Sequence, residues 1–427
     1  MRIVGVVAVL IASACNTSPK PKPEPAPGPP APAPAPPQPV PPPPAPPPAP
    51  VVAMPGDAHA LADASNAFGF ELWHRIARPA NQAFSPASIS IAFAMTALGA
   101  KGETAAQIAK VFHFGDKLDS WGQLEQALAS KPGVALHIAN RLFGAKAFHI
   151  EQPFLDQTRT AFGAPLEQLD FAADPEAARG QINSWVADQT GKRITELMPP
   201  SSIDELTRLV LVNAIYFLAD WQAPFKHEFT GDEPFHVSLT ATKTVKMMHG
   251  EGWLYGKVDG ATLLELPYQG GDTSMLVVLP NAIDGLSKLE ASASPAVLSK
   301  WWAAIGSGAV TVSLPRFTIS GNSIDLAKQL AALGMPLVFD KRLADLTGVA
   351  PATTPDQRLY VSHVFHQAFV KIDEKGTEAA AATAVQEAAA GAAAPTAAFV
   401  ADHPFAFFIV DKPSGLVLFM GHVTDPS

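Results

Sequence analysis

Cysteine is nearly absent from this sequence, and clusters of basic residues are missing. Cys15 is the only cysteine among 427 residues, so we expect neither disulfides nor thiol chemistry in the folded part. The formal net charge is −9, which argues against a nucleic-acid or polyanion-binding surface. Motifs of nucleotide-binding loops, zinc proteases and serine hydrolases are missing too. We therefore expect no enzyme and no cofactor, and because the histidines lack metal-ligand spacing we expect no metal.

The first fifteen residues, "MRIVGVVAVLIASAC", have the composition of an export signal. One basic residue precedes an apolar stretch from Ile3 to Ala12, and small residues lead to Cys15. The stretch is short for a transmembrane helix. The ending resembles a bacterial lipoprotein signal, which implies lipid attachment at Cys15 and anchorage in the periplasm or on the cell surface. An ordinary signal cleaved after Ala14, giving a secreted protein, is the alternative.

Proline dominates the next segment, residues 16–55, and most of all residues 19–50. Such a composition cannot form a packed core and favours extended polyproline II. At ~3.1 Å per residue, about 32 residues span up to ~100 Å. We expect a stalk, the alternative being a ligand for a proline-recognising module. The predicted plan is a signal (1–15), a linker (16–55) and one folded head (56–427).

The sequence of the head predicts an α+β fold, with helices dominating the first half and strands the second half. Ser85 is placed as the cap of a helix that begins at Pro86 and ends before Gly99. The segment "TRLVLVNAIYFL" is apolar on both faces, which indicates a central strand covered on both sides. Further expected elements are a helix at 102–112, a hairpin turning at 269–272, a strand at 309–317, a helix at 323–333 closed by Gly334, a long strand at 358–373, and two final strands around 411–415.

From about Asp57 to Pro426 the head resembles the serpin family. The resemblance is carried, in chain order, by "AFSPASIS", "INSWVADQTGKRITELMP", "LVLVNAIYFLADWQAPF", "LELPYQGGDTSMLVVLP", "VSLPRFTI", "HQAFVKIDEKGTEAAAATA" and "HPFAFFIVDKPSGLVLFMGHVTDP". It implies helices around a central five-stranded mixed sheet, smaller sheets, and an exposed reactive-centre loop at about residues 374–402. In that family a protease cleaves the loop and is acylated, and the cut loop then inserts into the sheet as a new strand.

The resemblance gives a purpose to an Ala-rich run, "DEKGTEAAAATAVQEAAAGAAAPTAAF", which has no repeating apolar face. Residues entering a closed sheet must be small and must not be proline. Small side chains alternate from Thr377, so that one face would turn into the molecule, and Gly376 would act as a pivot. The implied hinge comprises Glu374, Lys375, Gly376, Thr377, Glu378, Ala379, Ala380, Ala381, Ala382 and Thr383. The alternative is an exposed Ala-rich helix without function.

Two further groups of residues match positions of the family. Ser85, Ser88, Asn213 and His366 match the "shutter", a polar network beneath the sheet, and Asn213 in an apolar strand needs buried partners in any case. Trp221, Arg316 and Glu374 match the "breach" where the loop enters. Arg316 with Glu374 would be a charge pair that steadies the top of the sheet, although a pair that is exposed adds little stability.

Family spacing from Glu374 puts the scissile bond at Ala390–Gly391, whereas spacing from the C-terminal motif puts it near Ala393–Ala394. We favour Ala390. Alanine before the bond suits elastase-like or subtilisin-like proteases and not trypsin-like ones. The expected function is suicide-substrate inhibition by a monomer whose partner is a serine protease or a papain-like cysteine protease. The alternative is a non-inhibitory binding or carrier module whose loop is cleaved as a plain substrate.

Overall fold

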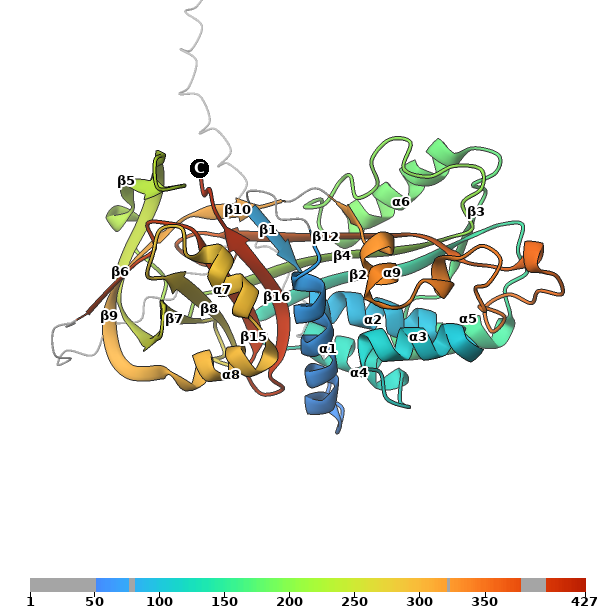
Figure 1. The fold of residues 1–427 in the computed structure, drawn as a ribbon, viewed down its shortest axis with the longest axis horizontal. Coiled ribbons are helices and arrows are strands. Elements are labelled where there is room, and N and C mark those ends of the chain that lie inside the picture. The colour runs from blue at the N-terminus through green and yellow to red at the C-terminus, as the bar shows by residue number, and fades with distance from the viewer. Residues whose placement is uncertain (1–50, 77–80, 321–322, 378–396) are drawn as a thin grey trace, which may run out of the picture. The chain divides into compact units, whose positions relative to one another are not determined.

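Two β-sheets carry the fold of the head (Figure 1). The computed structural model describes residues 51–76, 81–320, 323–377 and 397–427. Within these residues the first sheet runs β1-β16-β15-β8-β7-β6-β9-β14, and β5 pairs with β6 off this path. Its strands are β1 (Asn81–Phe84), β5 (Gly231–His236), β6 (Thr242–Val258), β7 (Ala261–Pro267), β8 (Thr273–Pro280), β9 (Ile305–Pro315), β14 (Ala397–Val400), β15 (Phe405–Asp411) and β16 (Leu416–Val423).

The second sheet is mixed and holds the candidate site. Its order is β10-β12-β13-β4-β2-β3, and β11 pairs with β12 beside β10. Apart from the two-residue β13, its strands therefore occupy the five positions that the serpin resemblance implies. They are β2 (Val134–Ala145), β3 (Glu167–Leu169), β4 (Leu209–Asp220), β10 (Phe317–Ile319), β11 (Ile324–Asp325), β12 (Val361–Ile372) and β13 (Gly376–Thr377).

Helices pack against both sheets. They are α1 (Ala58–Trp73), α2 (Pro86–Ala97), α3 (Gly102–Phe112), α4 (Asp119–Ala129), α5 (Gln152–Phe162), α6 (Pro175–Gln189), α7 (Leu286–Ser292), α8 (Pro295–Ala303) and α9 (Ala327–Leu333). On the second sheet α6 covers one face and α2 and α4 cover the other, whereas α7 and α8 pack against the first sheet. Short 3₁₀ turns are η1 (His227–Phe229), η2 (Leu337–Phe339) and η3 (Pro355–Gln357). Every residue of α2 up to Thr96 is buried, because this helix lies in the middle of the fold beneath β2 and β4.

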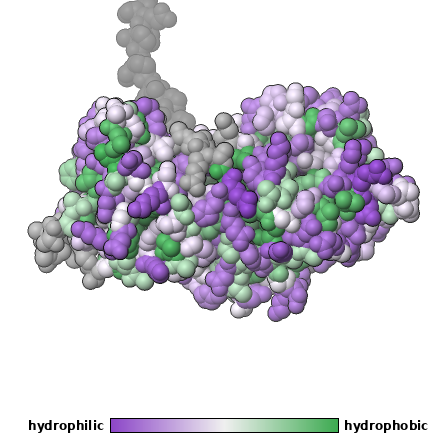
Figure 2. Space-filling view, viewed as in Figure 1, coloured by the Kyte–Doolittle hydropathy of each residue, from purple (hydrophilic) through white to green (hydrophobic). Residues whose placement is uncertain are grey.

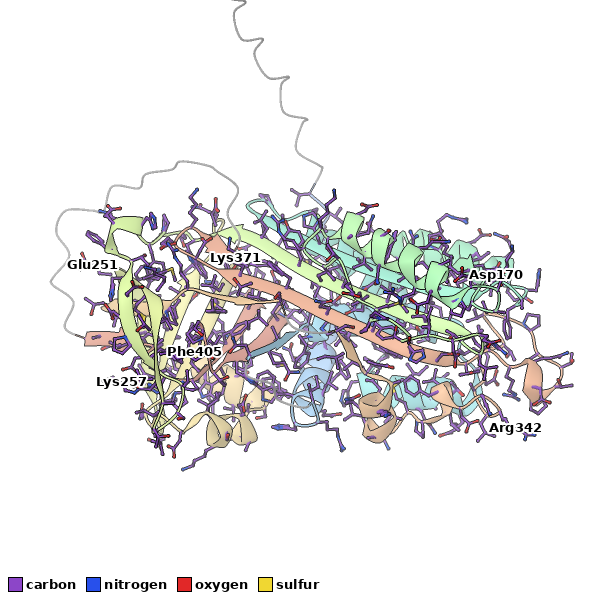
Figure 3. All side chains as sticks on the ribbon, turned by 90° about the horizontal axis from the view of Figure 1, so that it is seen from above. Asp170, Glu251, Lys257, Arg342, Lys371 and Phe405 are labelled. Atoms are coloured by element: carbon purple, nitrogen blue, oxygen red, sulfur yellow. The ribbon has the colours of Figure 1, made fainter. Side chains whose placement is uncertain are left out.

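The central strand β4 is buried on both faces, as its uninterrupted apolar sequence predicts. On one side Leu209, Leu211 and Ile215 belong to the main core. On the other side Val210 and Val212 join a second, smaller core with α6. Figure 3, seen from above, shows the long strands running side by side, with α6 over one face. Any new strand beside β4 must therefore fit between two packed layers.

Most predicted elements are confirmed, and one helix is corrected. Ser85 caps α2, its side chain accepting a hydrogen bond from the Ser88 amide at 3.1 Å. The helix expected at 323–333 begins only at Ala327, since Ile324 and Asp325 form β11 along the edge of β12. The Asp325 carboxylate then accepts a hydrogen bond from the Ala327 amide. Pairing with a neighbouring strand outweighs helix propensity there.

The surface of the head is mixed in character. In Figure 2 polar residues are interspersed with small, separate apolar patches over the face viewed. Among the residues that the structure describes, no helix combines the length and apolar character needed to cross a bilayer. Residues 1–50, which include Cys15 and most of the expected linker, lie outside the described ranges.

Candidate functional site: the loop hinge at the end of the central sheet

Two residues of the hinge, Gly376 and Thr377, are already part of the sheet as β13. Gly376 and Thr377 pair antiparallel with Asp220 and Ala219 of β4, and Thr377 also pairs antiparallel with Ile372 of β12. Farther along, β12 and β4 pair directly and in parallel, from Val361 and Leu209 to Phe369 and Tyr216. The two strands therefore separate at one end, and β13 occupies the opening. Whether the loop is inserted at rest, which the sequence leaves open, is answered for these two residues.

Two residues that follow β4, Trp221 and Phe225, hold the segment that leads into β13. The Trp221 amide donates to the Lys375 carbonyl at 2.6 Å, and the Trp221 indole donates to the Asp373 carbonyl at 3.0 Å. The Phe225 amide donates to the Glu374 carbonyl at 2.8 Å. These bonds satisfy the polar backbone groups of a bend that is mostly buried. Trp221, expected at the breach, thus lies against the hinge itself.

Gly376 is required by a close approach of two backbones. A Cβ on this residue would lie 2.1 Å from the Ala219 carbonyl oxygen and 2.7 Å from the Asp220 Cα. Real side chains do not tolerate such contacts with backbone atoms. Glycine at 376 therefore lets β13 lie against β4, a steric reason that adds to the pivot expected from the sequence.

Thr377 turns into the molecule, on the face that the alternation of small residues predicts. Its side chain is fully buried, and its hydroxyl shares a hydrogen bond of 2.7 Å with the hydroxyl of Tyr268, which is fully buried as well. Tyr268 stacks on Trp221, with ring centroids 4.4 Å apart. Burial raises the pKa of Tyr268 well above its usual value, although the hydrogen bond with Thr377 opposes this, so the phenol stays neutral.

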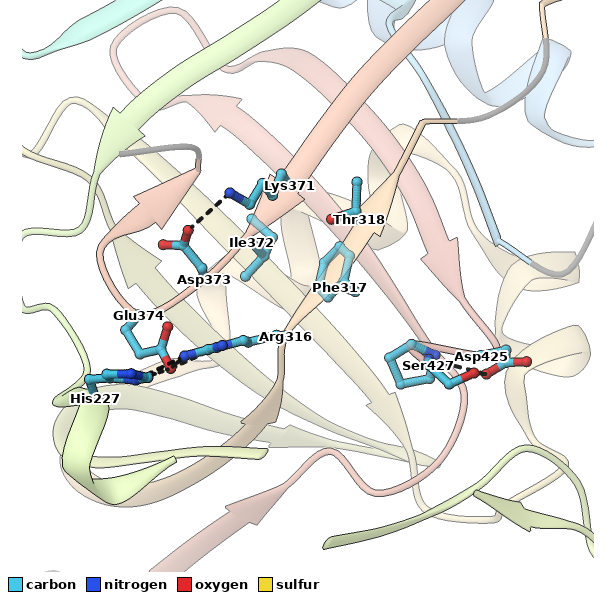
Figure 4. Close-up of a pocket in the computed structure, with 11 residues that line it drawn as sticks. His227, Arg316, Phe317, Thr318, Lys371, Ile372, Asp373, Glu374, Asp425 and Ser427 are labelled. Carbon is cyan, nitrogen blue, oxygen red and sulfur yellow. Dashed lines mark hydrogen bonds and ion pairs between the residues drawn. The ribbon is translucent and has the colours of Figure 1, made fainter. Parts of the chain in front are cut away.

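Arg316 and Glu374 form an ion pair beside the hinge (Figure 4). The Arg316 Nε donates to the Glu374 carboxylate at 2.7 Å, and the Thr230 hydroxyl donates to it at 2.6 Å. The expected pair is therefore present, and it is partly buried, since 10% of the Glu374 side chain and 33% of the Arg316 side chain are exposed. Partial burial raises the pKa of Glu374, but the hydrogen bonds from Arg316 and Thr230 and the Arg316 charge lower it by more, and the net shift is downward.

A cavity of about 520 Å³ opens beside this ion pair. Its lining comes from η1, from the neighbouring ends of β10 and β12, and from residues 425–427. Figure 4 shows Lys371 turned toward Asp373, and it shows His227 beside the Glu374 carboxylate. Because the cationic side chains here already have carboxylate partners, the charges of this cavity mainly fix the hinge.

The shutter residues lie together under the middle of the sheet. Asn213 and His366 are directly opposite each other on β4 and β12, and Asn140 of β2 is opposite Asn213 on the other side. The Asn213 amide donates to the Ser88 carbonyl at 2.9 Å and to the Ser88 hydroxyl at 2.6 Å. It also contacts the side-chain oxygen of Asn140. Ser85 completes the group from the start of α2.

His366 is held in its neutral form in this network. The Ser85 amide donates to His366 Nε2 at 3.2 Å, so this nitrogen must accept, and Nδ1 then donates to the Asn213 side-chain oxygen. Burial lowers the pKa of His366 to about 3, a shift that the contact with Asn213 only partly opposes. A proton on Nε2 would break the bond to α2 that joins the helix to the two separating strands.

The remaining site predictions fall outside the described residues. These are the hinge residues Glu378, Ala379, Ala380, Ala381, Ala382 and Thr383, the scissile pair Ala390 and Gly391, and the lipid attachment at Cys15. They stay predictions. Within the ranges that the structure describes, no group of His, Cys, Asp and Glu side chains is arranged to hold a metal ion.

Three residues of the site were not predicted from the sequence. Asn140 carries the same signal as Asn213, an amide side chain in an otherwise apolar strand, and that signal could have found it. Thr230 and Tyr268 carry no such signal. Each acts through one hydrogen bond, to Glu374 and to Thr377, that only the folded chain brings together.

The fold and site define a class of protein in which a two-residue strand lies between two strands that pair directly along most of their length. Comparison with known proteins gives the family: a model described as serpin (serine protease inhibitor) matches residues 63–426. The chain belongs to the serpin family. By that membership it is a protease inhibitor and not an enzyme.

Relatives and solved structures agree with this assignment. The leukocyte elastase inhibitor of the pig (Sus scrofa) is 42% identical over 340 residues, covering 76% of this chain and 88% of that protein. The human (Homo sapiens) leukocyte elastase inhibitor is 40% identical with the same coverage. Uncleaved ovalbumin superposes with a TM-score of 0.78 at 33% identity, over 86% of this chain and all of ovalbumin. Maspin gives a TM-score of 0.77 at 28% identity, over 87% of this chain and all of maspin.

Proposed function

We propose that this protein is a suicide-substrate inhibitor of serine proteases with elastase-like or subtilisin-like specificity. The protease serine attacks the carbonyl carbon of the residue before the scissile bond, the amine of the following residue leaves, and an acyl ester joins the two proteins. The freed end of the loop then enters the sheet between β4 and β12 before water hydrolyses the ester. Papain-like cysteine proteases, which form the equivalent thioester, are a second target class.

The position of β13 is the observation that supports this most. Thr377 is paired with both β4 and β12 at the point where those strands separate. Continued insertion in the same direction gives a strand antiparallel to both neighbours. It replaces one parallel ladder, between Val361 and Phe369 on β12 and Leu209 and Tyr216 on β4, with two antiparallel ladders. Antiparallel pairing is the slightly more stable kind per residue.

The energy of insertion is large enough to act on a trapped protease. From Gly376 to Ala390, about 15 residues at ~3.3 Å each form a strand on the order of 50 Å long. About a dozen new ladder hydrogen bonds at roughly 1 kcal/mol each contribute on the order of 10 kcal/mol before packing. This is similar to the whole stability of many domains. It can therefore distort a protease active site that is dragged along by the loop.

The target class follows from the residues around the proposed cut. Ala390 before Gly391, or Ala393 before Ala394 in the other register, fits a shallow specificity pocket. The relatives named leukocyte elastase inhibitor support the same choice. Arg or Lys, which trypsin-like proteases require, occurs at neither position.

Incubation with pancreatic elastase, read on a denaturing gel, tests the proposal. We expect a covalent complex with the summed mass of the enzyme and the inhibitor's larger fragment, and trypsin as the matched control should give none through these bonds. The mass of the released C-terminal fragment assigns the cut to Ala390–Gly391 or Ala393–Ala394. Clean cleavage without a complex would instead support a non-inhibitory binding or carrier module.

We also propose that the head works outside a bacterial cytoplasm, held to a membrane through a lipid on Cys15 and a proline-rich stalk. The support is the signal-like sequence before Cys15 and the proline content of residues 19–50. Such a tether would keep the inhibitor near the surface it protects while the loop meets incoming proteases.

A further inference from the structure

The hydroxyl of Tyr268 is placed as a receptor for one residue of the hinge. Its ring is held between two aromatic neighbours: it stacks on Trp221 at 4.4 Å and meets Phe217 edge-on at 5.0 Å. Its backbone is fixed as well, since its amide donates to the Thr273 carbonyl and it forms a bridge with Trp221. The phenolic oxygen therefore has a position that does not depend on the hinge.

Thr377 is the residue that meets this oxygen. Both side chains are fully buried and their hydroxyls lie 2.7 Å apart. If the hinge left the sheet, the Tyr268 hydroxyl would lose this partner in an apolar setting, which is costly. If Thr377 entered the sheet without the phenol of Tyr268, the Thr377 hydroxyl would be buried without a hydrogen-bond partner. The hydrogen bond between the two hydroxyls thus favours the seated hinge, in which Thr377 is paired in the sheet.

We infer that Tyr268 is a positioning residue for inhibition, which holds Thr377 in its pairing with both β4 and β12 and so directs the cleaved loop into the sheet ahead of hydrolysis. The inference rests on the proposed function and deepens it. Tyr268 touches neither the protease nor the scissile bond. It acts because insertion that starts from a seated Thr377 needs only to extend an existing strand, whereas an unseated hinge must first find the opening.

A double-mutant cycle with Tyr268→Phe and Thr377→Val tests this. Each single change leaves one buried hydroxyl without its partner, and the double change removes both. The first measurement is hydrogen exchange of the intact, full-length protein, followed in peptides that contain Glu374–Thr377. We expect each single variant to exchange about tenfold faster there and the double variant to return toward the parent rate. Tyr360→Phe is the control, since its hydroxyl donates to the Leu206 carbonyl away from the hinge.

The second measurement is the share of elastase cleavage events that end in covalent complex. We expect Tyr268→Phe to reduce this share several-fold while the loop is cut at the parent rate, and the double variant to recover part of the loss. A destabilised but otherwise irrelevant site would not show this recovery. Unchanged exchange in Tyr268→Phe, or effects that simply add in the double variant, would overturn the inference. If the parent forms no complex at all, the proposed function fails, and the exchange cycle still decides the role of Tyr268.

Discussion

Gly376 packs directly against Ala219: a Cβ on residue 376 would lie 2.1 Å from the Ala219 carbonyl oxygen. This contact places Gly376 inside the sheet, against β4. The pairing of β13 with β4 therefore requires that residue 376 has no side chain, so a single substitution there can disrupt it.

Gly376→Ala should unseat β13. Because the added methyl group meets backbone atoms, the strand must shift or leave the opening. We expect the share of cleavages that end in covalent complex to fall roughly tenfold, which corresponds to ~1.4 kcal/mol on the insertion barrier. Gly231→Ala is the matched control, since a Cβ there meets nothing within 4 Å. Equal complex yields from the two variants would contradict this placement of the hinge.

Thr377→Arg should convert the inhibitor into a substrate. Thr377 is fully buried in the seated hinge, so the guanidinium would have to enter the sheet without a partner, at a cost of several kcal/mol. The proposed scissile residues are unchanged, and the loop should be cut as fast as in the parent. Titration against elastase should show rapid cleavage with little complex, whereas Thr377→Ser, which keeps the hydroxyl, should stay inhibitory. Trapping by Thr377→Arg at the parent level would show that Thr377 does not enter the sheet.

His366 should make stability fall in acid. Its pKa is lowered from 6.5 to about 3 in the folded state, so between these values the unfolded chain binds a proton that the folded chain does not. Its contribution is therefore complete above about pH 6.5 and is lost as pH falls, by up to about 1.4 kcal/mol per pH unit. Urea unfolding at pH 7.5, 5.5 and 4.5 measures this dependence. In His366→Gln the slope should be shallower, and equal slopes would mean that His366 does not titrate in this way.

Cys15→Ala should release the protein from membranes. If Cys15 carries the lipid, the alanine variant has no anchor beyond an uncleaved or differently cleaved signal. Expression in a bacterial host followed by separation of membrane and soluble fractions measures this directly. Parent protein in the membrane fraction and variant in the soluble fraction are expected. Continued fractionation of the variant with membranes would remove the lipid-anchor hypothesis.

The sequence predicted the fold and the general place of the site, because both depend on local patterns and ordered motifs. Ser85 as a cap, the apolar faces of β4 and the small side chain of Thr377 each follow from one residue and its neighbours. Tyr268 could not be found in this way, since its partner lies 109 positions along the chain. The late start of α9 was missed for a similar reason: β11 forms only because β12 offers it an edge.

The exposure of the breach pair was also beyond the sequence. Arg316 and Glu374 are charged residues that end strands or follow them, and such residues are usually solvated. The Glu374 carboxylate is held by Arg316 and Thr230, which lie 58 and 144 positions away along the chain. No local sequence pattern indicates contacts between residues so far apart.

The central claim is that the cut loop becomes a strand between β4 and β12, and thermal unfolding of the cleaved protein tests it most directly. The loop is cut by a protease that does not remain bound, the cut is confirmed by mass, and the melting temperatures of intact and cleaved protein are compared. A new strand that adds on the order of 10 kcal/mol should raise the melting temperature by roughly 10–20 °C for a domain of this size. An unchanged melting temperature after a confirmed cut would show that the loop does not insert.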